Sequence, residues 1–534
     1  MGIIWLGTVL FLSGAFAYLT GLTVGFFKTS VRPPLPPGPK GLPFIGSIHA
    51  LPPSGEIEAR HWLKHKKLYG PISSVKVLDQ TIIIVNDADL AFEILEKRSA
   101  KHSSRPRQVF AGEMMGWENA LAFIPYNDRF RAHRKNMSRI IGSQRAVSQF
   151  NELQEAEVGH FLLHVLQDPD KLITEHIRRE TGAVILNIVY GYNAERIESD
   201  PLIDMAGDAM DKFAKAAVPG AFMVDILPFL RNLPSWLPGT GFKQLALQWG
   251  SELRDVTEKP YAFVKHQKAS GKPQTSFLSR LIDAGDGNSS DDFINKWSAM
   301  SLYVAGADTT VAALSTFFLA MITNPDAQRK AQEEIDRLTS GNRLPVAADR
   351  ESLVFVDAIV KETLRWGPVA PMALPHTSTE DDVWEGYLIP KDAIIMANVW
   401  HFTQDANTYP DPLRFKPERF LKTVNHEPEA DPRNVVFGFG RRICPGRLLA
   451  DTALFLNIAQ SLAVFNISKP LNVDGTEIEP EIRWESGVVS HPAPFKVKVS
   501  PRSEGSEKLI RAVEGMYPWQ DSDAEILNSM MYEK

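Results

Sequence analysis

The chain is short of cysteine, of excess positive charge and of internal repetition, and each shortage argues against a class of protein. One cysteine among 534 residues cannot form a disulfide within the chain, which favours a reducing compartment. A formal net charge of −6 offers no broad basic surface, so we expect no nucleic-acid partner. The lack of internal repeats and of long low-complexity tracts argues against a repeat architecture. With 44% apolar and 23% charged residues, the composition is that of a globular protein.

Charged side chains are also absent from residues 3–27, IIWLGTVLFLSGAFAYLTGLTVGFF. A helix of this length reaches roughly 37 Å, enough to cross a hydrocarbon core of ~30 Å. The alternative is a cleaved signal peptide with its cleavage site at residues 15–17, but the apolar run continues beyond that site and no basic segment precedes it. The first side-chain cations, Lys28 and Arg32, follow the run, which places the remaining chain on the cytosolic side. We predict an uncleaved anchor at residues 1–27 that contacts membrane lipid.

The remaining chain divides into three parts. Residues 28–50 form a proline-rich linker, which we expect to be stiff and extended. Residues 51–502 form the main domain, which is predicted to be mainly helical with two short strands between residues 69 and 87. Residues 503–534 form a polar C-terminal extension, predicted to be a solvated helix or loop.

Three helices can be predicted in the main domain. The longest covers about residues 291–322 and is almost uncharged over three turns, so it should be buried around much of its circumference. Ser289 and Asp292 have the spacing of a capping box at its start. Two others are predicted at residues 353–366 and 447–465. The last of these begins directly after the single cysteine.

That cysteine, Cys444, lies in the stretch FGFGRRICPG at residues 437–446. A helix start offers unpaired amide groups and the positive end of the helix dipole, and both favour a thiolate over a thiol. The three glycines allow a tight turn, and Pro445 suits the first helical turn. A buried structural cysteine is the alternative, but it would need none of these neighbours. The pattern therefore favours a thiolate that binds a metal or attacks an electrophile.

The same stretch resembles the haem-ligand signature of the cytochrome P450 family, Phe-x-x-Gly-x-Arg-x-Cys-x-Gly. The matching positions are Phe437, Gly440, Arg442, Cys444 and Gly446. The resemblance implies a cytochrome P450 fold, mainly α with small β-sheets. An N-terminal transmembrane helix would precede this fold in the chain. The resemblance also implies that these positions bind haem b, with Cys444 as the axial ligand of the iron.

Two further segments resemble family motifs. Glu362 and Arg365 match a Glu-x-x-Arg motif, and a spacing of three puts both side chains on one helical face. The segment at residues 417–420, PERF, resembles the one whose arginine joins that pair. Taken alone, Glu-x-x-Arg carries little information because exposed helical ion pairs are common. Together with the cysteine stretch, it implies a structural triad of Glu362, Arg365 and Arg419.

The centre of the longest helix breaks the rules of helix composition at residues 305–310, AGADTT. Glycine inside a helix costs about 1 kcal/mol relative to alanine, and a buried acid costs more. A helix kink with a satisfied core carboxylate would explain both. The segment also resembles the oxygen-binding segment of the family, in which Asp308 and Thr309 are catalytic and relay protons during O2 activation.

Haem propionates need cationic or hydrogen-bonding partners, and the resemblance nominates Arg442, Arg134 and His376. Phe130 stands where the family usually has a tryptophan, so one hydrogen bond to a propionate should be missing. For His376, an ordinary surface histidine is the alternative.

The resemblance implies a monooxygenase that oxidises an apolar small molecule with O2. Its electrons would come from NADPH–cytochrome P450 reductase, and we expect a monomer in the endoplasmic reticulum membrane with a cytosolic catalytic domain. Arg129, Arg131, Lys135 and Arg441 could form the reductase docking face or simply a solvated helix surface. The alternatives are a haem–thiolate isomerase, dehydratase or peroxygenase, or a non-enzymatic haem carrier or sensor.

Within the family, the chain is similar to the fungal O-methylsterigmatocystin oxidoreductase group. Three segments carry this similarity: residues 176–192, 374–382 and 509–523. It implies a fungal secondary metabolite, a polyketide or similar polycyclic molecule, as the substrate. The predicted pocket segments are mostly apolar, as expected for a buried ligand site, and comprise residues 110–123, the first half of the long helix, 369–373 and 487–489.

Overall fold

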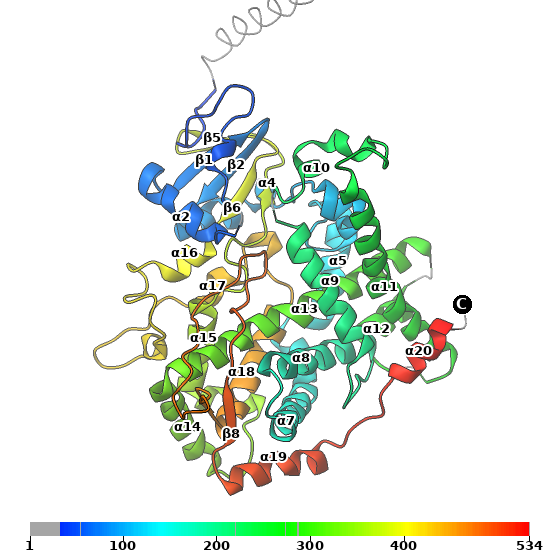
Figure 1. Cartoon of the computed structure of the whole chain (residues 1–534), viewed down its shortest axis with the longest axis vertical. Coiled ribbons are helices and arrows are strands. Elements are labelled where there is room, and N and C mark those ends of the chain that lie inside the picture. The colour runs from blue at the N-terminus through cyan, green and yellow to red at the C-terminus, as the bar shows by residue number, and fades with distance from the viewer. Residues whose placement is uncertain (1–31, 54, 219, 273, 286–287, 533–534) are drawn as a thin grey trace, which may run out of the picture.

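Helices make up most of the chain, and α13 (Ser289–Thr323) runs through its centre (Figure 1). The structure is a computed structural model that describes residues 32–532 apart from 54, 219, 273, 286 and 287. The other α-helices are α2 (Glu58–Tyr69), α3 (Ala88–Ala91), α4 (Ser99–His102), α5 (Asp128–Ile141), α6 (Gln144–Val147), α7 (Asn151–Gln167), α8 (Ile173–Tyr190), α9 (Pro201–Ala216), α10 (Met223–Ile226), α11 (Gly241–Ala269), α12 (Phe277–Ala284), α14 (Pro325–Thr339), α15 (Val354–Trp366), α16 (Val399–Gln404), α17 (Arg433–Val436), α18 (Arg447–Val464), α19 (Glu504–Met516) and α20 (Ala524–Tyr532). Short 3-10 and π-helical segments are η1 (Ile48–Ala50), η2 (Phe92–Lys97), η3 (Val109–Met114), η4 (Trp117–Asn119), η5 (Ser148–Phe150), η6 (Pro228–Asn232), η7 (Ala347–Ser352), η8 (Pro417–Phe420) and η9 (Gly440–Arg442).

Helix α13 lies at the centre of the hydrophobic core and contributes residues to both of its main clusters. It packs against α5, α8, α9 and α18, as its uncharged composition predicts. Around its N-terminal half, the core is shared with α8, α9 and α11, and around its C-terminal half with α7, α15 and α18. The helix ends at Thr323, before the Asn324–Pro325 dipeptide. Its start differs from the prediction, because the side chain of Asn288 accepts from the amide of Asp291 and so replaces the expected Ser289–Asp292 box.

The strands form three small sheets. The largest has the order β1-β2-β6-β3, with β1 antiparallel to β2, β2 parallel to β6 and β6 antiparallel to β3. The strands are β1 (Ile72–Val77), β2 (Gln80–Val85), β3 (His376–Thr377), β4 (Asp382–Trp384), β5 (Tyr387–Ile389), β6 (Ile394–Ala397), β7 (Phe465–Ser468) and β8 (Lys498–Pro501). β4 pairs with β5, and β7 pairs with β8. The two strands predicted between residues 69 and 87 are confirmed as β1 and β2.

The described part of the linker lies along this sheet region. Ser74 of β1 donates through its amide to Pro37 O at 2.9 Å and through its hydroxyl to Pro36 O at 2.6 Å. A Cβ atom on Gly38 would collide with the carbonyl of Ser74, so the chain can approach β1 only with glycine there. The described part of the linker is therefore held against the domain, and it is not extended throughout, because residues 42–46 form a turn and residues 48–50 form η1.

The C-terminal extension packs on the body of the protein. Ile510 and Val513 of α19 are fully buried, and the Trp519 ring stacks on the His160 ring of α7 with centroids 3.7 Å apart. Leu527 of α20 belongs to the same core as α11. Figure 1 shows α19 and α20 following the outside of the helical body. The expectation of a solvated segment is wrong for these buried faces, because apolar residues at helical spacing pack into the core.

Among the described residues, α13 is the single helix long and apolar enough to cross a membrane, and most of it is buried inside the protein. The anchor predicted at residues 1–27 lies outside the described residues.

Candidate active site

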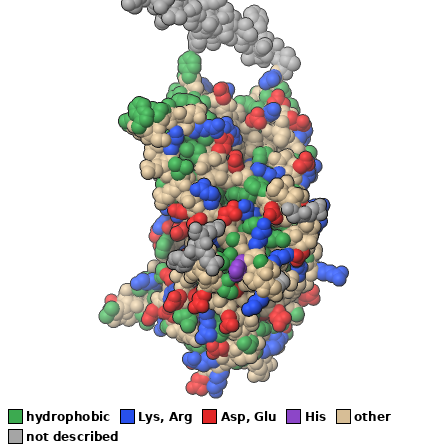
Figure 2. Space-filling model, turned by 90° about the vertical axis from the view of Figure 1, so that its right-hand side faces the viewer, with side chains coloured by type: hydrophobic (Ala, Val, Ile, Leu, Met, Phe, Trp, Pro, Cys, Tyr) green, Lys and Arg blue, Asp and Glu red, His purple; other side chains and the backbone are tan. Residues whose placement is uncertain are grey.

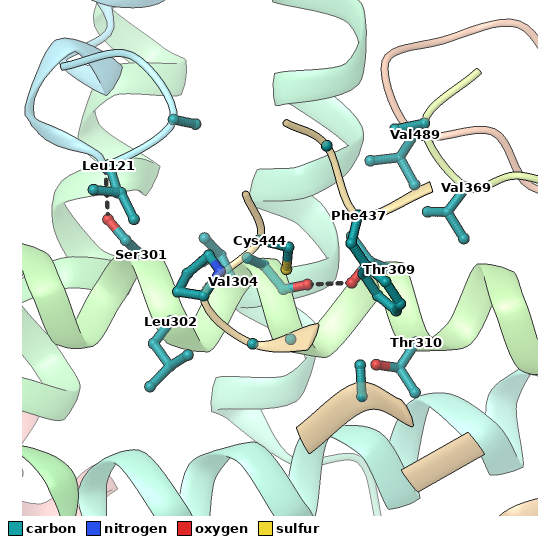
Figure 3. A pocket seen from close by; sticks show the side chains of 18 of the residues that line it. Leu121, Ser301, Leu302, Val304, Thr309, Thr310, Val369, Phe437, Cys444 and Val489 are labelled. Carbon is teal, nitrogen blue, oxygen red and sulfur yellow. Dashed lines mark hydrogen bonds between the residues drawn. The ribbon is translucent and has the colours of Figure 1, made fainter. Parts of the chain in front are cut away.

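A cavity of about 360 Å³ lies between α13 and the start of α18. Its walls come from α5, α8, α9, η4, the segment at residues 364–376 and Val488–Val489, and they are mostly apolar. The side chain of Cys444 faces the cavity beside α13, and Phe437 lies next to it (Figure 3). The cysteine stretch and the centre of the long helix therefore meet at one site, as the sequence predicts.

Two glycines shape the loop before Cys444. Gly438 has φ +79° and Gly440 has φ +54°, in the left-handed region that favours glycine. A Cβ atom on Gly440 would also collide with the carbonyl oxygen of Leu95. The resulting turn lets the amide of Cys444 donate to Phe437 O at 2.8 Å. Gly446 differs, since its φ is −86° and its missing side chain leaves open space at the cavity wall.

Two opposing effects act on the pKa of the Cys444 thiol. Burial raises its pKa, while the amide of Gly446, the charge of Arg134 and the amide and charge of Arg447 lower it. The amides at the helix start thus favour the thiolate, as the sequence predicts, but burial is the larger effect and leaves the pKa raised. A metal ion that replaces the proton would stabilise the thiolate, since coordination deprotonates a thiol.

Three arginines line the cavity without a carboxylate partner among the described residues: Arg442 is buried, and Arg105 and Arg134 are half-buried. Arg442 donates to Ser103 O at 2.6 Å and to other backbone carbonyls, and Arg134 donates to Ile443 O at 2.7 Å. Arg105 bonds only to backbone carbonyls. Burial lowers the pKa of Arg442 to about 8, with the charges of Arg105 and Arg134 adding to the effect, and burial lowers the pKa of Arg105 to about 9.

Such a cluster of uncompensated charge is costly unless an anion neutralises it. A group with two carboxylates would do so, and the two propionates of a haem provide them. The cavity therefore offers both kinds of group that a haem needs: a thiol at the cavity wall as a metal ligand and an arginine cluster for the propionates.

His376 lies beside this cluster. It is on β3, has only 3% of its surface exposed, and its Nδ1 bonds to the carbonyl of His102 at 2.7 Å. The surface-histidine alternative is therefore wrong, because the side chain lines the cavity. Phe130, which stands at the position of the usual tryptophan, packs under Arg442, with the guanidinium carbon 3.8 Å from the ring centroid. It supports Arg442 by a cation–π contact instead of donating a hydrogen bond.

The AGADTT segment of α13 borders the cavity through Thr309. Its hydroxyl donates to Ala305 O at 2.7 Å, one turn earlier (Figure 3). Gly306 has a packing role, because a Cβ atom there would lie 2.8 Å from the Ile185 side chain of α8. The glycine thus lets α8 approach α13 closely.

The predicted triad forms outside the cavity. Arg365 Nε lies 2.7 Å from Glu362 Oε2, and Arg419 Nε lies 3.1 Å from the same oxygen. All three side chains are fully buried. Arg365 also donates to the carbonyls of Thr403 and Pro412 at 2.9 and 2.8 Å, which links α15 to α16 and to the loop before η8.

Comparison with known proteins decides the family. A family model described as Cytochrome P450 matches residues 36–499. The chain belongs to the cytochrome P450 family. It is 46% identical over 496 residues to Cytochrome P450 monooxygenase claR of Ampulloclitocybe clavipes, covering 93% of this chain and 92% of that protein. It is 41% identical over 502 residues to O-methylsterigmatocystin oxidoreductase of Aspergillus flavus, covering 94% of each.

The family, the mainly helical P450 fold and the similarity to the O-methylsterigmatocystin oxidoreductase group are therefore confirmed. The relatives are named consistently, so the enzyme class, a cytochrome P450 monooxygenase, is confirmed as well.

Asp308 does not line the P450 cavity, although it adjoins Thr309 in sequence. Its carboxylate pairs with His491 Nε2 at 3.2 and 3.3 Å. His491 follows the Val488–Val489 segment, which does line the cavity. The side chain of His491 is 27% exposed and that of Asp308 is 11% exposed. The pair therefore lies between solvent and the buried helix α13. Sequence reasoning missed His491, because nothing nearby in the sequence distinguishes it.

Arg105 was missed as well. It lies in the segment before η3, far in sequence from Arg134, Arg442 and His376, and only the fold brings it to the cavity. Its neighbours, Ser104 and Pro106, form no recognisable motif with it.

Proposed function

We propose that this P450 inserts one oxygen atom from O2 into an apolar fungal secondary metabolite, with electrons from NADPH–cytochrome P450 reductase. The observation that carries the proposal is the uncompensated arginine cluster over a cavity that contains the only thiol. Haem b would be held there by Cys444 through its iron and by Arg105, Arg134, Arg442 and His376 through its propionates. When bound, it supplies the one-electron chemistry that activates O2.

The residues of the chain would control protons and water. The Thr309 hydroxyl can rotate from the Ala305 carbonyl toward a water molecule in the cavity and hold that water in place. Asp308 and His491 provide an acid and an imidazole between α13 and solvent, which is the pairing needed to replace a proton used in the cavity. The apolar walls would exclude bulk water and orient the substrate.

Thr309→Ala should uncouple the enzyme. Haem and substrate binding should stay close to wild-type levels, because the change removes only a hydroxyl and a methyl group. Product formed per NADPH should fall at least about tenfold while hydrogen peroxide rises, because a general acid typically contributes 10²–10⁴-fold. Both are measured in one assay with the reductase.

Thr316→Ala is the matched control, since Thr316 makes the same bond to the carbonyl four residues earlier, Ala312, at 2.9 Å in the same helix. Unchanged coupling in Thr309→Ala would exclude a proton-handling role. If the wild-type enzyme consumed no NADPH but turned over peroxide, the result would instead support the peroxygenase alternative.

The polycyclic substrate class is supported by two observations. The cavity walls are largely apolar, and a relative that matches along nearly its full length is named O-methylsterigmatocystin oxidoreductase.

Reductase docking is supported by a cluster of exposed arginines on the α5 side of the cysteine loop. The guanidinium groups of Arg131 and Arg441 lie 5.4 and 5.0 Å from the Tyr126 ring centroid. Acidic redox partners are steered by such basic patches.

Anchoring in the endoplasmic reticulum membrane through residues 1–27 is supported by surface composition. Hydrophobic side chains gather at the upper end of the described molecule in Figure 2, and large apolar side chains are exposed in the linker and in and after η6. They include Leu42, Phe44, Phe229 and Trp236.

This topology makes a direct prediction. The glycosylation sequons at Asn136, Asn288 and Asn466 should carry no glycan in the native fungal membrane, because the domain faces the cytosol. The intact mass after endoglycosidase treatment should be unchanged, and the protein should stay in the membrane pellet after alkaline extraction. A mature N-terminus at Tyr18 or a glycan on any of the three sequons would contradict the topology.

A further inference from the structure

The C-terminal extension lies outside the part of the chain that the family model matches. The match ends at residue 499, and the helices of the extension, α19 and α20, begin at Glu504 and Ala524. A Cβ atom on Gly159 of α7 would lie 2.8 Å from the Val513 side chain of α19. Because glycine weakens a helix, α7 gives up local stability at the point where the extension packs on it. The body of the protein is therefore shaped to receive the extension.

Trp519 joins α7 to the segment between α8 and α9. The Trp519 ring stacks on the His160 ring of α7, with centroids 3.7 Å apart and planes at 15°. The guanidinium carbon of Arg196, in the α8–α9 segment, lies 5.2 Å from the centroid of the same ring. His160 Nε2 also bonds to the carbonyl oxygen of Tyr517 at 2.9 Å. Stacking and the cation–π contact thus hold the Trp519 ring against two elements of the body.

Asp523 joins the same segment to α11. Its backbone amide donates to Asn193 O at 3.0 Å, and one carboxylate oxygen accepts the amide of Asn193 at 2.9 Å. Gln267, near the end of α11, donates to the other carboxylate oxygen at 3.4 Å. Only 6% of Asp523 is exposed, and Leu527 is buried in the core cluster that includes α11. The buried carboxylate therefore has partners on two further elements of the body.

The α8–α9 segment leads into a wall of the cavity. Asp200 accepts the Tyr192 hydroxyl at 2.9 Å and the Glu195 amide at 2.8 Å through one carboxylate oxygen. Its other oxygen accepts amides of the first turn of α9. Helix α9 packs on α11 and carries Met210 and Phe213, which line the cavity. A continuous series of contacts therefore connects the extension to the cavity wall.

We propose that the C-terminal extension is a clamp that positions this wall for the substrate, with Trp519 and Asp523 as positioning residues. The clamp fixes the start of α9 and the end of α11 to α7, and so it keeps Met210 and Phe213 in place. The proposal rests on the proposed function for the use of the cavity, and it adds a segment that the family model does not include. Neither Trp519 nor Asp523 lines the cavity, so changes to them should alter ligand affinity without altering the cysteine loop.

Clotrimazole and imidazole test this in the haem-loaded protein by titration of the Soret band. Both ligate a haem iron through an imidazole nitrogen, but only clotrimazole carries bulky aryl groups that need the cavity wall. Trp519→Ala and Asp523→Ala should each weaken clotrimazole binding about fivefold and leave imidazole binding within about twofold, because changes between coupled sites commonly have effects of this size. Haem content should stay at the wild-type level.

Two variants serve as controls. Trp519→Phe should bind clotrimazole as the wild type does, because it keeps a ring to stack on His160. Asp521→Ala should have no effect, because Asp521 is exposed, although it lies two residues before Asp523.

Hydrogen exchange separates positioning from a general loss of stability, and it needs neither ligand nor turnover. In Trp519→Ala and Asp523→Ala, the amides of α9 should exchange at least about tenfold faster than in the wild type. The amides of α18, which begins beside the cysteine, should exchange at the wild-type rate.

Equal losses for both azoles, an unchanged affinity for clotrimazole, a wild type that binds imidazole but not clotrimazole, or exchange that is unchanged in α9 or faster throughout the chain would each overturn the proposal. The expected differences in exchange and clotrimazole affinity, found in a protein that shows no NADPH-dependent oxidation, would overturn the proposed function alone.

Discussion

Cys444→Ser should abolish NADPH-driven turnover and the thiolate-type absorption band of the reduced, carbon-monoxide-bound protein. Serine is nearly isosteric, and the bond from residue 444 to Phe437 O uses the backbone amide, so the loop should keep its shape. A hydroxyl is far more basic than a thiol, and the amides of Gly446 and Arg447 with the charge of Arg134 cannot make it an anion at neutral pH. The cavity would keep its arginines and lose the thiol that we propose as the metal ligand.

Absorption spectra and turnover of purified Cys444→Ser, compared with wild type, check this expectation. Part of the population should still fold, which circular dichroism would report. A thiolate-type band in the variant would show that Cys444 is not the ligand.

Arg365→Ala should destabilise the fold more than any change to the cavity. Removing one partner of a buried ion pair typically costs about 3–5 kcal/mol, because the other charge is left buried and unpaired. Here Glu362 would keep Arg419, but the carbonyls of Thr403 and Pro412 would lose their donor. Since native stability is about 5–15 kcal/mol, we expect little soluble, haem-loaded protein and a strongly lowered Tm.

Arg329→Ala is the control for this prediction. Arg329 pairs with Glu333 at 2.6 Å on the exposed face of α14, where such pairs contribute little. Equal Tm values for Arg365→Ala, Arg329→Ala and wild type would show that the triad has no structural importance.

The parts of the site that the sequence predicts are those with local patterns. The turn around Cys444, the ion pair of Glu362 with Arg365 and the burial of α13 depend on spacing within a few residues. Each pattern reflects a backbone or helical-face requirement that operates within one element. The structure brings the cysteine loop and Thr309 to one cavity as expected.

What the sequence could not predict depends on contacts between distant segments. Arg105 joins Arg134 and Arg442 at the cavity, and His491 pairs with Asp308, only because the tertiary fold brings them there. The net effect on the Cys444 pKa also depends on burial, which outweighs the helix start. The C-terminal extension, polar in composition, uses a few apolar residues such as Val513 to pack on α7.

The most direct test of the account follows the oxygen atoms. The purified P450 is combined with a fungal reductase, NADPH, isotopically labelled O2 and its metabolite substrate, identified by profiling a deletion strain, and the product is analysed by mass spectrometry. A monooxygenase should place one labelled atom in the product and the other in water, with NADPH and O2 consumed in equal amounts. A product that forms without label, or only when peroxide replaces NADPH and O2, would contradict the account.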